Sequence, residues 1–286
     1  MHRVLALSRA LMACAWRNSV TRFAFGAALL STATTCWATE TALDLHQLRL
    51  NGLETGLYTF DDAQYITFGL LFCFVIMVST MLTSSENEVF LLVRMRSRGE
   101  VWMARIVALC ALCAVFLGAV WTTWAAWLAV TAVDRPMSAG WSAAYDHVIA
   151  AVQRNPDGLA PIYYLAVNEY LRSTSTPLVL ALLQSSLFIL VFMSVGMLGA
   201  VLAQAVRRPV FALFSSVTYV FLYLVFEAIG LPALTVVTAQ GSLLLSTHTP
   251  QAQPYLPYMV SFAAWSAVLV VLFAIGATQV RSVRLA

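Results

Sequence analysis

Residues 84–105, SSENEVFLLVRMRSRGEVWMAR, separate two long apolar runs and are too short and too charged to cross a bilayer. Two acidic residues, Glu86 and Glu88, lie near the start of the stretch, and arginines crowd its second half around Gly99. The helix dipole favours acidic groups near a helix N-terminus and basic groups near its C-terminus. We therefore expect a short helix along the membrane surface, on the side that holds most arginines, where it offers a docking surface to a soluble partner.

The composition of the 286-residue chain is typical of a polytopic membrane protein. Hydrophobic residues make up 61% of the chain and charged residues 10%, whereas soluble domains carry roughly 25% charged residues. At about 20 residues per span, the chain has room for six transmembrane helices. The sequence thus predicts an all-α membrane protein, one transmembrane domain over residues 1–286, with the lipid bilayer and no nucleic acid among its partners.

Six apolar runs are the candidate spans, and polar segments separate them. These runs cover residues 23–38, 65–82, 101–133, 177–206, 210–230 and 258–280. Three residues, Arg207 to Pro209, separate the fourth run from the fifth. So short a link predicts that these two helices are antiparallel neighbours.

The N-terminal segment 2–18 has the pattern of an amphipathic helix at the membrane interface. Leu7, Leu11 and Ala15 share one helical face with Val4, and the opposite face carries arginines at positions 9 and 17. A cleaved signal peptide is the alternative, because a basic lead precedes an apolar core that ends in Cys36-Trp37-Ala38.

The distribution of arginines predicts the orientation of the spans. With both termini in the cytoplasm, the outer side holds four of the sixteen basic residues, Arg49, Arg135, Arg154 and Arg172, and the other twelve lie inside. The two long outer segments are then residues 134–176 and 231–257.

The chain contains no lysine, which excludes several kinds of chemistry. A Walker A loop needs a lysine to reach the nucleotide phosphates, and Schiff-base catalysis needs one as nucleophile. The four histidines are scattered, and neither H-E-x-x-H nor G-x-S-x-G occurs. We expect no catalytic and no metal-binding residues, and we interpret the five cysteines, including Cys110-x-x-Cys113, as small packing residues.

Polar residues inside the spans are the candidates for a transport pathway. The fifth run places Ser216, Tyr219, Tyr223 and Glu227 within about 80° of one helical face, and an ionisable group in a span is a functional hypothesis by default. The alternative is that Glu227 reaches the outer interface. Gln184 on the fourth run is a further candidate, with hydrogen bonding between helices as its alternative.

The amphipathic lead-in helix, the six spans and the charged loop together resemble the membrane subunit of ABC-2-type transporters. The similarity in sequence covers Glu88–Arg105, where an acidic residue and an apolar run lead to arginine, Ser-Arg and a tryptophan that opens the third span. In that family this loop is a coupling helix that inserts into a cleft of the ATPase subunit. The resemblance assigns ATPase coupling to Glu88, Arg94 and Arg98 of a loop at residues 84–100, and to Trp102 just beyond it. It also makes 2–18 the elbow helix, and 231–257 a partly inserted outer segment that gates the exit.

The resemblance implies a multi-pass permease subunit of an ATP-driven exporter in the bacterial cytoplasmic (inner) membrane. Such a chain is not itself an enzyme and binds no cofactor. Two copies of an ABC ATPase subunit bind ATP and Mg²⁺, and a second permease chain, identical or related, completes a homo- or heterodimer. The outer segment 134–176 is longer than the family pattern, which leaves the substrate open.

Other classes of protein remain as alternatives. An ATP-independent membrane sensor or scaffold would bind a ligand through residues 134–176. A proton-coupled carrier would depend on Glu227, although neither repeats nor broken helices are evident in the sequence. An intramembrane enzyme is disfavoured because the sequence shows no paired nucleophile and base.

Overall fold

In the computed structural model, helices make up most of the described parts of the chain, and no strand occurs there. It describes residues 2–45, 49–83, 98–131, 137–147, 169–206, 209–231, 234, 238–248 and 257–282.

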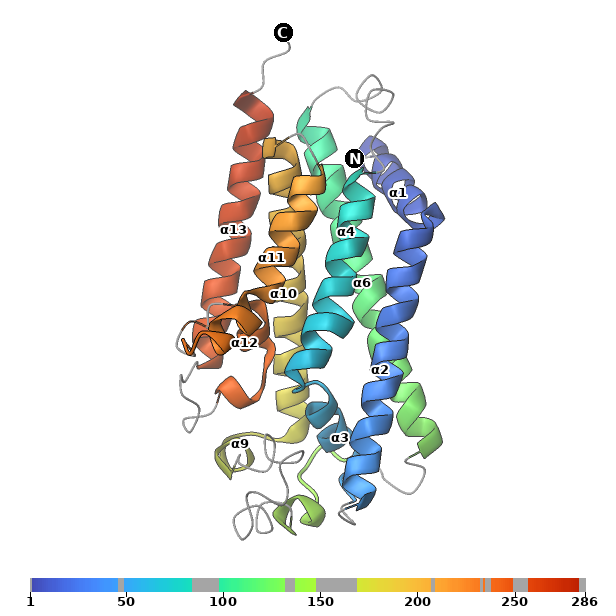
Figure 1. The fold of residues 1–286 in the computed structure, drawn as a ribbon, viewed down its shortest axis with the longest axis vertical. Coiled ribbons are helices and arrows are strands. Elements are labelled where there is room, and N and C mark those ends of the chain that lie inside the picture. The colour runs from blue at the N-terminus through green and yellow to red at the C-terminus, as the bar shows by residue number, and fades with distance from the viewer. Residues whose placement is uncertain are drawn as a thin grey trace.

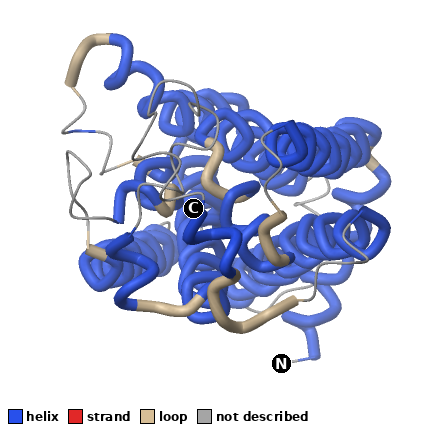
Figure 2. The backbone as a smooth tube through the Cα atoms, turned by 90° about the horizontal axis from the view of Figure 1, so that it is seen from below, coloured by secondary structure: helices blue, strands red, loops and turns tan. Residues whose placement is uncertain are grey.

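The long helices stand side by side in one bundle, as the side view and the end-on view both show (Figures 1 and 2). Helix α1 lies at one end of the bundle, where α13 also finishes, and α3 and α9 lie at the other end (Figure 1). The elements are α1 His2–Arg17, α2 Ser19–Leu45, α3 Gly52–Thr59, the π-helix η1 Tyr65–Phe72, α4 Cys73–Thr83, α6 Arg98–Thr131, α9 Glu169–Thr174, α10 Pro177–Val206, α11 Pro209–Ala228, α12 Ala239–Leu243, η4 Ser246–His248 and α13 Tyr258–Ser282.

Four helical segments among the described residues are long and apolar enough to cross a membrane. They are Tyr65–Leu82, Arg98–Thr131, Pro177–Ala205 and Tyr258–Gln279, and they match the second, third, fourth and sixth predicted spans closely. The prediction of an all-helical, membrane-embedded chain is confirmed at this level.

Local sequence explains where several of these helices begin and end. Helix α10 starts with Pro177 in its first turn, where a missing backbone N–H costs nothing, and the Thr176 hydroxyl accepts the Val179 N–H at 3.4 Å. Helix α11 is followed by Gly230, whose φ of 72° is typical of a helix stop. The Leu231 N–H returns to the Phe226 carbonyl at 2.9 Å and closes that stop.

Helix α2 is not among the four apolar segments because hydroxyl side chains are spread along it. Its buried face is a stripe of small residues at helical spacing, including Thr21, Ala28 and Thr32. Thr21 Oγ1 lies 2.5 Å from Thr80 Oγ1 of α4, and Thr32 Oγ1 lies 2.8 Å from the Tyr65 hydroxyl of η1. Small residues allow such close packing of helices in membranes, so α2 is an integral member of the bundle.

Helix α1 forms over the residues for which an amphipathic helix is predicted. Leu7, Leu11 and Ala15 are buried, while Arg9 and Arg17 are exposed. Its apolar face packs against α6 and, to a lesser extent, against α2 and α4. The helix therefore lies across the end of the bundle at which α6 begins.

Aromatic side chains fill the centre of the bundle. The Phe74 ring lies 5.5 Å from Phe116 and 5.0 Å from Phe192, measured between ring centroids, and all three side chains are fully buried. These residues come from α4, α6 and α10, so one apolar core joins three of the long helices.

Candidate functional site

The proposed ATPase-coupling residues divide between described and undescribed parts of the chain. Glu88 and Arg94 lie outside the described residues. The structure resumes at Arg98, which opens α6 and is partly exposed at the same end of the bundle as α1. Trp102 follows one turn later and is 3% exposed.

Trp102 of α6 packs against α13, a helix far away in the sequence. Its ring lies directly over Gly276 of α13, where an added Cβ would overlap the ring atoms. Glycine is thus the residue that lets α13 approach α6 this closely. The beginning of α6 is thereby fixed to α13, and α6 also packs against α1.

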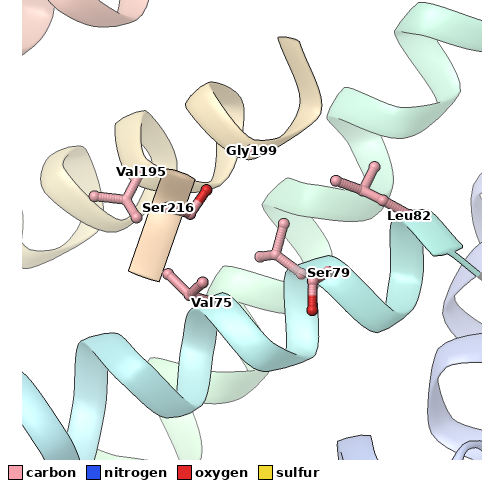
Figure 3. Close-up of a pocket in the computed structure, with 7 residues that line it drawn as sticks. Val75, Ser79, Leu82, Val195, Gly199 and Ser216 are labelled. Atoms are coloured by element: carbon pink, nitrogen blue, oxygen red, sulfur yellow. The ribbon is translucent and has the colours of Figure 1, made fainter. Parts of the chain in front are cut away.

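The predicted polar stripe of α11 is divided between two environments. Ser216 is 3% exposed and faces Gly199 of α10 and Val78 of α4 around a cavity of about 10 Å³ (Figure 3). A space of that size holds about one water molecule. Ser216 is therefore at a packed helix junction rather than in an open path.

Tyr219 lies one turn further along α11 and lines a much larger groove. This groove has a volume of about 460 Å³ and is bordered by α10, α11, α12 and α13. Tyr223 is half-buried against the main core. Glu227 is within α11, but its side chain lies outside the described residues. The structure thus brings Tyr219 to a cavity and leaves the role of Glu227 a prediction.

Gln184 hydrogen-bonds to other segments of the bundle, as expected under the alternative to a role in a transport pathway. Its Nε2 donates to the Phe60 carbonyl at 3.0 Å and to the Leu243 carbonyl at 3.4 Å. It also lines a cavity of about 230 Å³ between α3, α6 and α10, together with Trp121 and Trp124. Gln184 consequently ties α10 to the end of α3 and to α12.

The short helix α12 is a feature that sequence reasoning did not locate. All five of its residues are buried, and it contacts α10, α11 and η1. Gln240 Nε2 donates to Thr67 Oγ1 at 2.9 Å and to the Val220 carbonyl of α11 at 2.5 Å. Thr238 caps the helix by accepting the Gly241 N–H at 3.1 Å. The resemblance anticipated partial insertion of residues 231–257, and the cap at Thr238 was the available local signal for a helix.

Helix α12 meets the bundle at an unusual element. The stretch Tyr65–Phe72 is a π-helix eight residues long. Such helices are rare in proteins, and those that do occur are often found at functional sites. Thr67 lies in this element and accepts the Gln240 amide. The Gln240 side chain thus joins the buried helix α12 to the π-helical part of a candidate span.

A second unpredicted cluster closes the opposite end of the bundle from α1. Glu54 of α3 is fully buried, and its Oε1 and Oε2 accept the Ser142 N–H at 2.5 Å and the Ser142 hydroxyl at 2.7 Å. Asn51 and Glu54 also form a reciprocal capping box. The spacing Asn-x-x-Glu was a readable signal for the helix start, but the partner Ser142, far along the chain, was not.

Two further links hold together the segments that cover α3. Trp141 Nε1 donates to the Ser175 carbonyl at 2.7 Å, and Arg172 pairs with Asp146 at 2.5 Å on a largely exposed surface. Burial, reinforced by the nearby charges of Glu54 and Asp61, raises the pKa of Tyr145 above its usual value. The described parts of 134–176 therefore form an ordered cap on α3 rather than a loose loop.

Among the described residues, no group of three or more histidine, cysteine, aspartate or glutamate side chains is placed to hold a metal ion. The five cysteines are all free, with Cys110 exposed and Cys113 buried. Comparisons of the chain with protein-family models, curated proteins and solved structures found no match.

Proposed function

We propose that the chain is the membrane subunit of an ABC-2-type exporter in the bacterial cytoplasmic membrane. In this proposal two permease chains form the path, and two separate ATPase subunits bind ATP and Mg²⁺ and dock at the arginine-rich segment 84–100. The support comes from the sequence resemblance together with the way the two ends of the bundle are built.

We further propose six spans with both termini in the cytoplasm. Helices α2 and α11 join the four apolar segments as the first and fifth spans. Helix α2 turns large apolar side chains outward, with Phe23 78% exposed, Leu30 66% and Trp37 60%. An outward apolar face of this kind suits contact with lipid. Helix α11 has 20 residues, enough for about 30 Å at 1.5 Å per residue.

The observation that carries the proposal is the seating of Trp102 against Gly276. The segment that would receive the ATPase runs into α6, and the first turn of α6 is held by α13 while α1 packs alongside. Movement of the docking segment would therefore be transmitted to the first and last helices of the chain together. A lever of this kind is what coupling to an external ATPase requires.

Helix α12, on the other side of the bundle from the docking segment, is the candidate for control of substrate exit. Helix α12 is buried between the long helices, and the Gln240 side chain bonds it to both η1 and α11. A change in the tilt of α11 relative to η1 would therefore move the two acceptors of that amide with respect to each other. We assign to α12 the role of the gating segment.

The proposal predicts that an adjacent reading frame encodes an ABC ATPase. It is tested by the ATPase activity of the complex of the two chains, purified and reconstituted in lipid. Arg98→Ala should lower stimulation of ATP hydrolysis by at least about tenfold, because truncating an ion pair buried at an interface costs about 2–5 kcal/mol. Arg17→Ala is the control, since Arg17 is exposed at the same end but on α1. Equal activity in both variants would reject the docking assignment.

The ordered outer cap favours the sensor or scaffold as the second candidate function. Its segments are joined by Glu54–Ser142 and by Trp141–Ser175, so they present a fixed surface to a ligand. This candidate predicts that no ATPase subunit purifies with the chain and that substitutions in 84–100 are without effect.

A further inference from the structure

The groove beside Tyr219 has the dimensions and chemistry of a binding site. Its volume of about 460 Å³ falls within the range of roughly 300–1,000 Å³ usual for small-molecule pockets. One wall is a single face of α13 that runs from Ser261 to Leu272. At 1.5 Å per residue this wall is roughly 17 Å long.

The two ends of the groove differ in polarity. The end near the start of α13 holds the serines Ser261 and Ser242, whereas the other end is bounded by Leu198 and Leu272. Among the described residues that line it, none is charged. The groove thus suits a long apolar body that carries an uncharged polar group at one end.

Ser261 provides a second observation that points to a ligand. Its side chain is 1% exposed, and its Oγ has no hydrogen-bond partner. A buried hydroxyl without a partner is costly, and this one belongs to a residue that lines the polar end of the groove. A ligand with a hydroxyl or ester group would supply the missing bond.

The groove is also reachable from the side of the bundle. Val260 and Val268, which line it from α13, are 50% and 41% exposed. Helix α13 stands at the edge of the bundle (Figure 1). In a membrane this edge faces the hydrocarbon region, so an alkyl chain can enter without crossing water.

We propose that this groove binds one alkyl chain of a neutral membrane amphiphile, with an uncharged glycerol-type head at Ser261 and the chain extended along α13 toward Leu272. The absence of charge among the described lining residues argues for a neutral head over an anionic one. Binding needs neither ATP nor a partner subunit, so the proposal stands apart from the exporter assignment.

The test uses the purified full chain in detergent and a palmitoyl glycerol that carries a diazirine midway along its chain. After irradiation, the label should appear on peptides that cover residues 260–272 and 194–198, and an excess of unmodified palmitoyl glycerol should displace it. Val268→Trp places an indole ring in the groove and should lower the labelling about tenfold, because the alkyl chain would then overpack the site at a cost of this order. The matched control is Val270→Trp, since Val270 is 67% exposed and lies on the opposite side of α13. That variant should label like the wild type.

The polar end is tested separately with Ser261→Ala. This change should weaken displacement by palmitoyl glycerol while leaving displacement by hexadecane, which has no head group, unaltered. Labelling spread over every outward face of α13, or equal in the two tryptophan variants, would show ordinary contact with the apolar surface and would overturn the proposal. If an anionic phosphatidylglycerol competed more tightly than palmitoyl glycerol, the proposal that the ligand has a neutral head group would be overturned.

Discussion

The side-chain amide of Gln240 donates to the hydroxyl of Thr67 across 2.9 Å, although the two residues lie far apart in the sequence. Gln240 sits on the buried helix α12, and Thr67 sits in the π-helix that opens a membrane span. The same amide reaches the Val220 carbonyl of α11. One side chain therefore fastens the inserted segment to two long helices.

Gln240→Leu should destabilise the protein by about 1–3 kcal/mol, the usual cost of losing a buried hydrogen-bonded partner. The leucine keeps a similar volume but cannot donate to Thr67 or to Val220. Thermal unfolding of the purified protein in detergent measures the loss. Gln204→Leu on α10 is the control: the Oε1 atoms of both glutamines lack a hydrogen-bond partner, so the comparison isolates the two bonds that Gln240 Nε2 donates. An equal effect of both changes would show that the two hydrogen bonds of Gln240 do not stabilise the fold.

Gly276→Ala should displace Trp102, because the added Cβ would overlap the indole ring. We expect a lower melting temperature and reduced coupling to the ATPase. Gly118→Ala on α6 is the matched change, since nothing lies within 4 Å of its Cβ position. In that variant alanine should be neutral or stabilising by about 0.5–1 kcal/mol. If Gly276→Ala behaved like Gly118→Ala, the Trp102 contact would not anchor α6.

Glu54→Ala should loosen the cap on α3 by at least about 2 kcal/mol, because the N–H groups of buried Asn51 and half-buried Ser142 lose their acceptor. Glu54→Gln retains one oxygen and a capping-box partner, so its loss should be smaller. Thermal unfolding combined with limited proteolysis of residues 137–147 reports the change. Unaltered protease resistance in Glu54→Ala would contradict the bridging role of Glu54.

The stability of the cap on α3 should depend on pH in the alkaline range through Tyr145. Its phenol has a raised pKa in the folded chain, first through burial and then through Glu54 and Asp61. A raised pKa stabilises the fold below the unfolded pKa of about 10, and this contribution is lost as the pH rises above that value. Tyr145→Phe should therefore show a shallower loss of melting temperature between pH 9 and 11. Tyr170→Phe, an exposed residue of α9, should follow the wild type.

The sequence predicts those parts of the fold that depend on contiguous apolar runs. The segments Tyr65–Leu82 and Pro177–Val206 are bounded by local signals and agree with the structure. The apolar face of α1 is likewise readable from the spacing of Leu7, Leu11 and Ala15.

Features that depend on distant partners could not be predicted in the same way. Nothing adjacent to Trp102 indicates that Gly276 covers it, and nothing near Gln184 indicates Phe60 and Leu243 as acceptors. Burial of α12 depends on acceptors in two other helices. Sequence reasoning therefore located a segment of the fold only where a residue's own neighbours determine its environment, and the roles of the candidate site residues stay predictions.

The central claim is that the arginine-rich segment faces the cytoplasm, where an ATPase subunit can reach it. The most direct measurement places one cysteine at Ser97 in a variant whose native cysteines are replaced by alanine, and treats sealed membranes with an impermeant maleimide. Our account predicts labelling in inside-out vesicles and none in intact spheroplasts. Labelling from the outside of intact spheroplasts would contradict it.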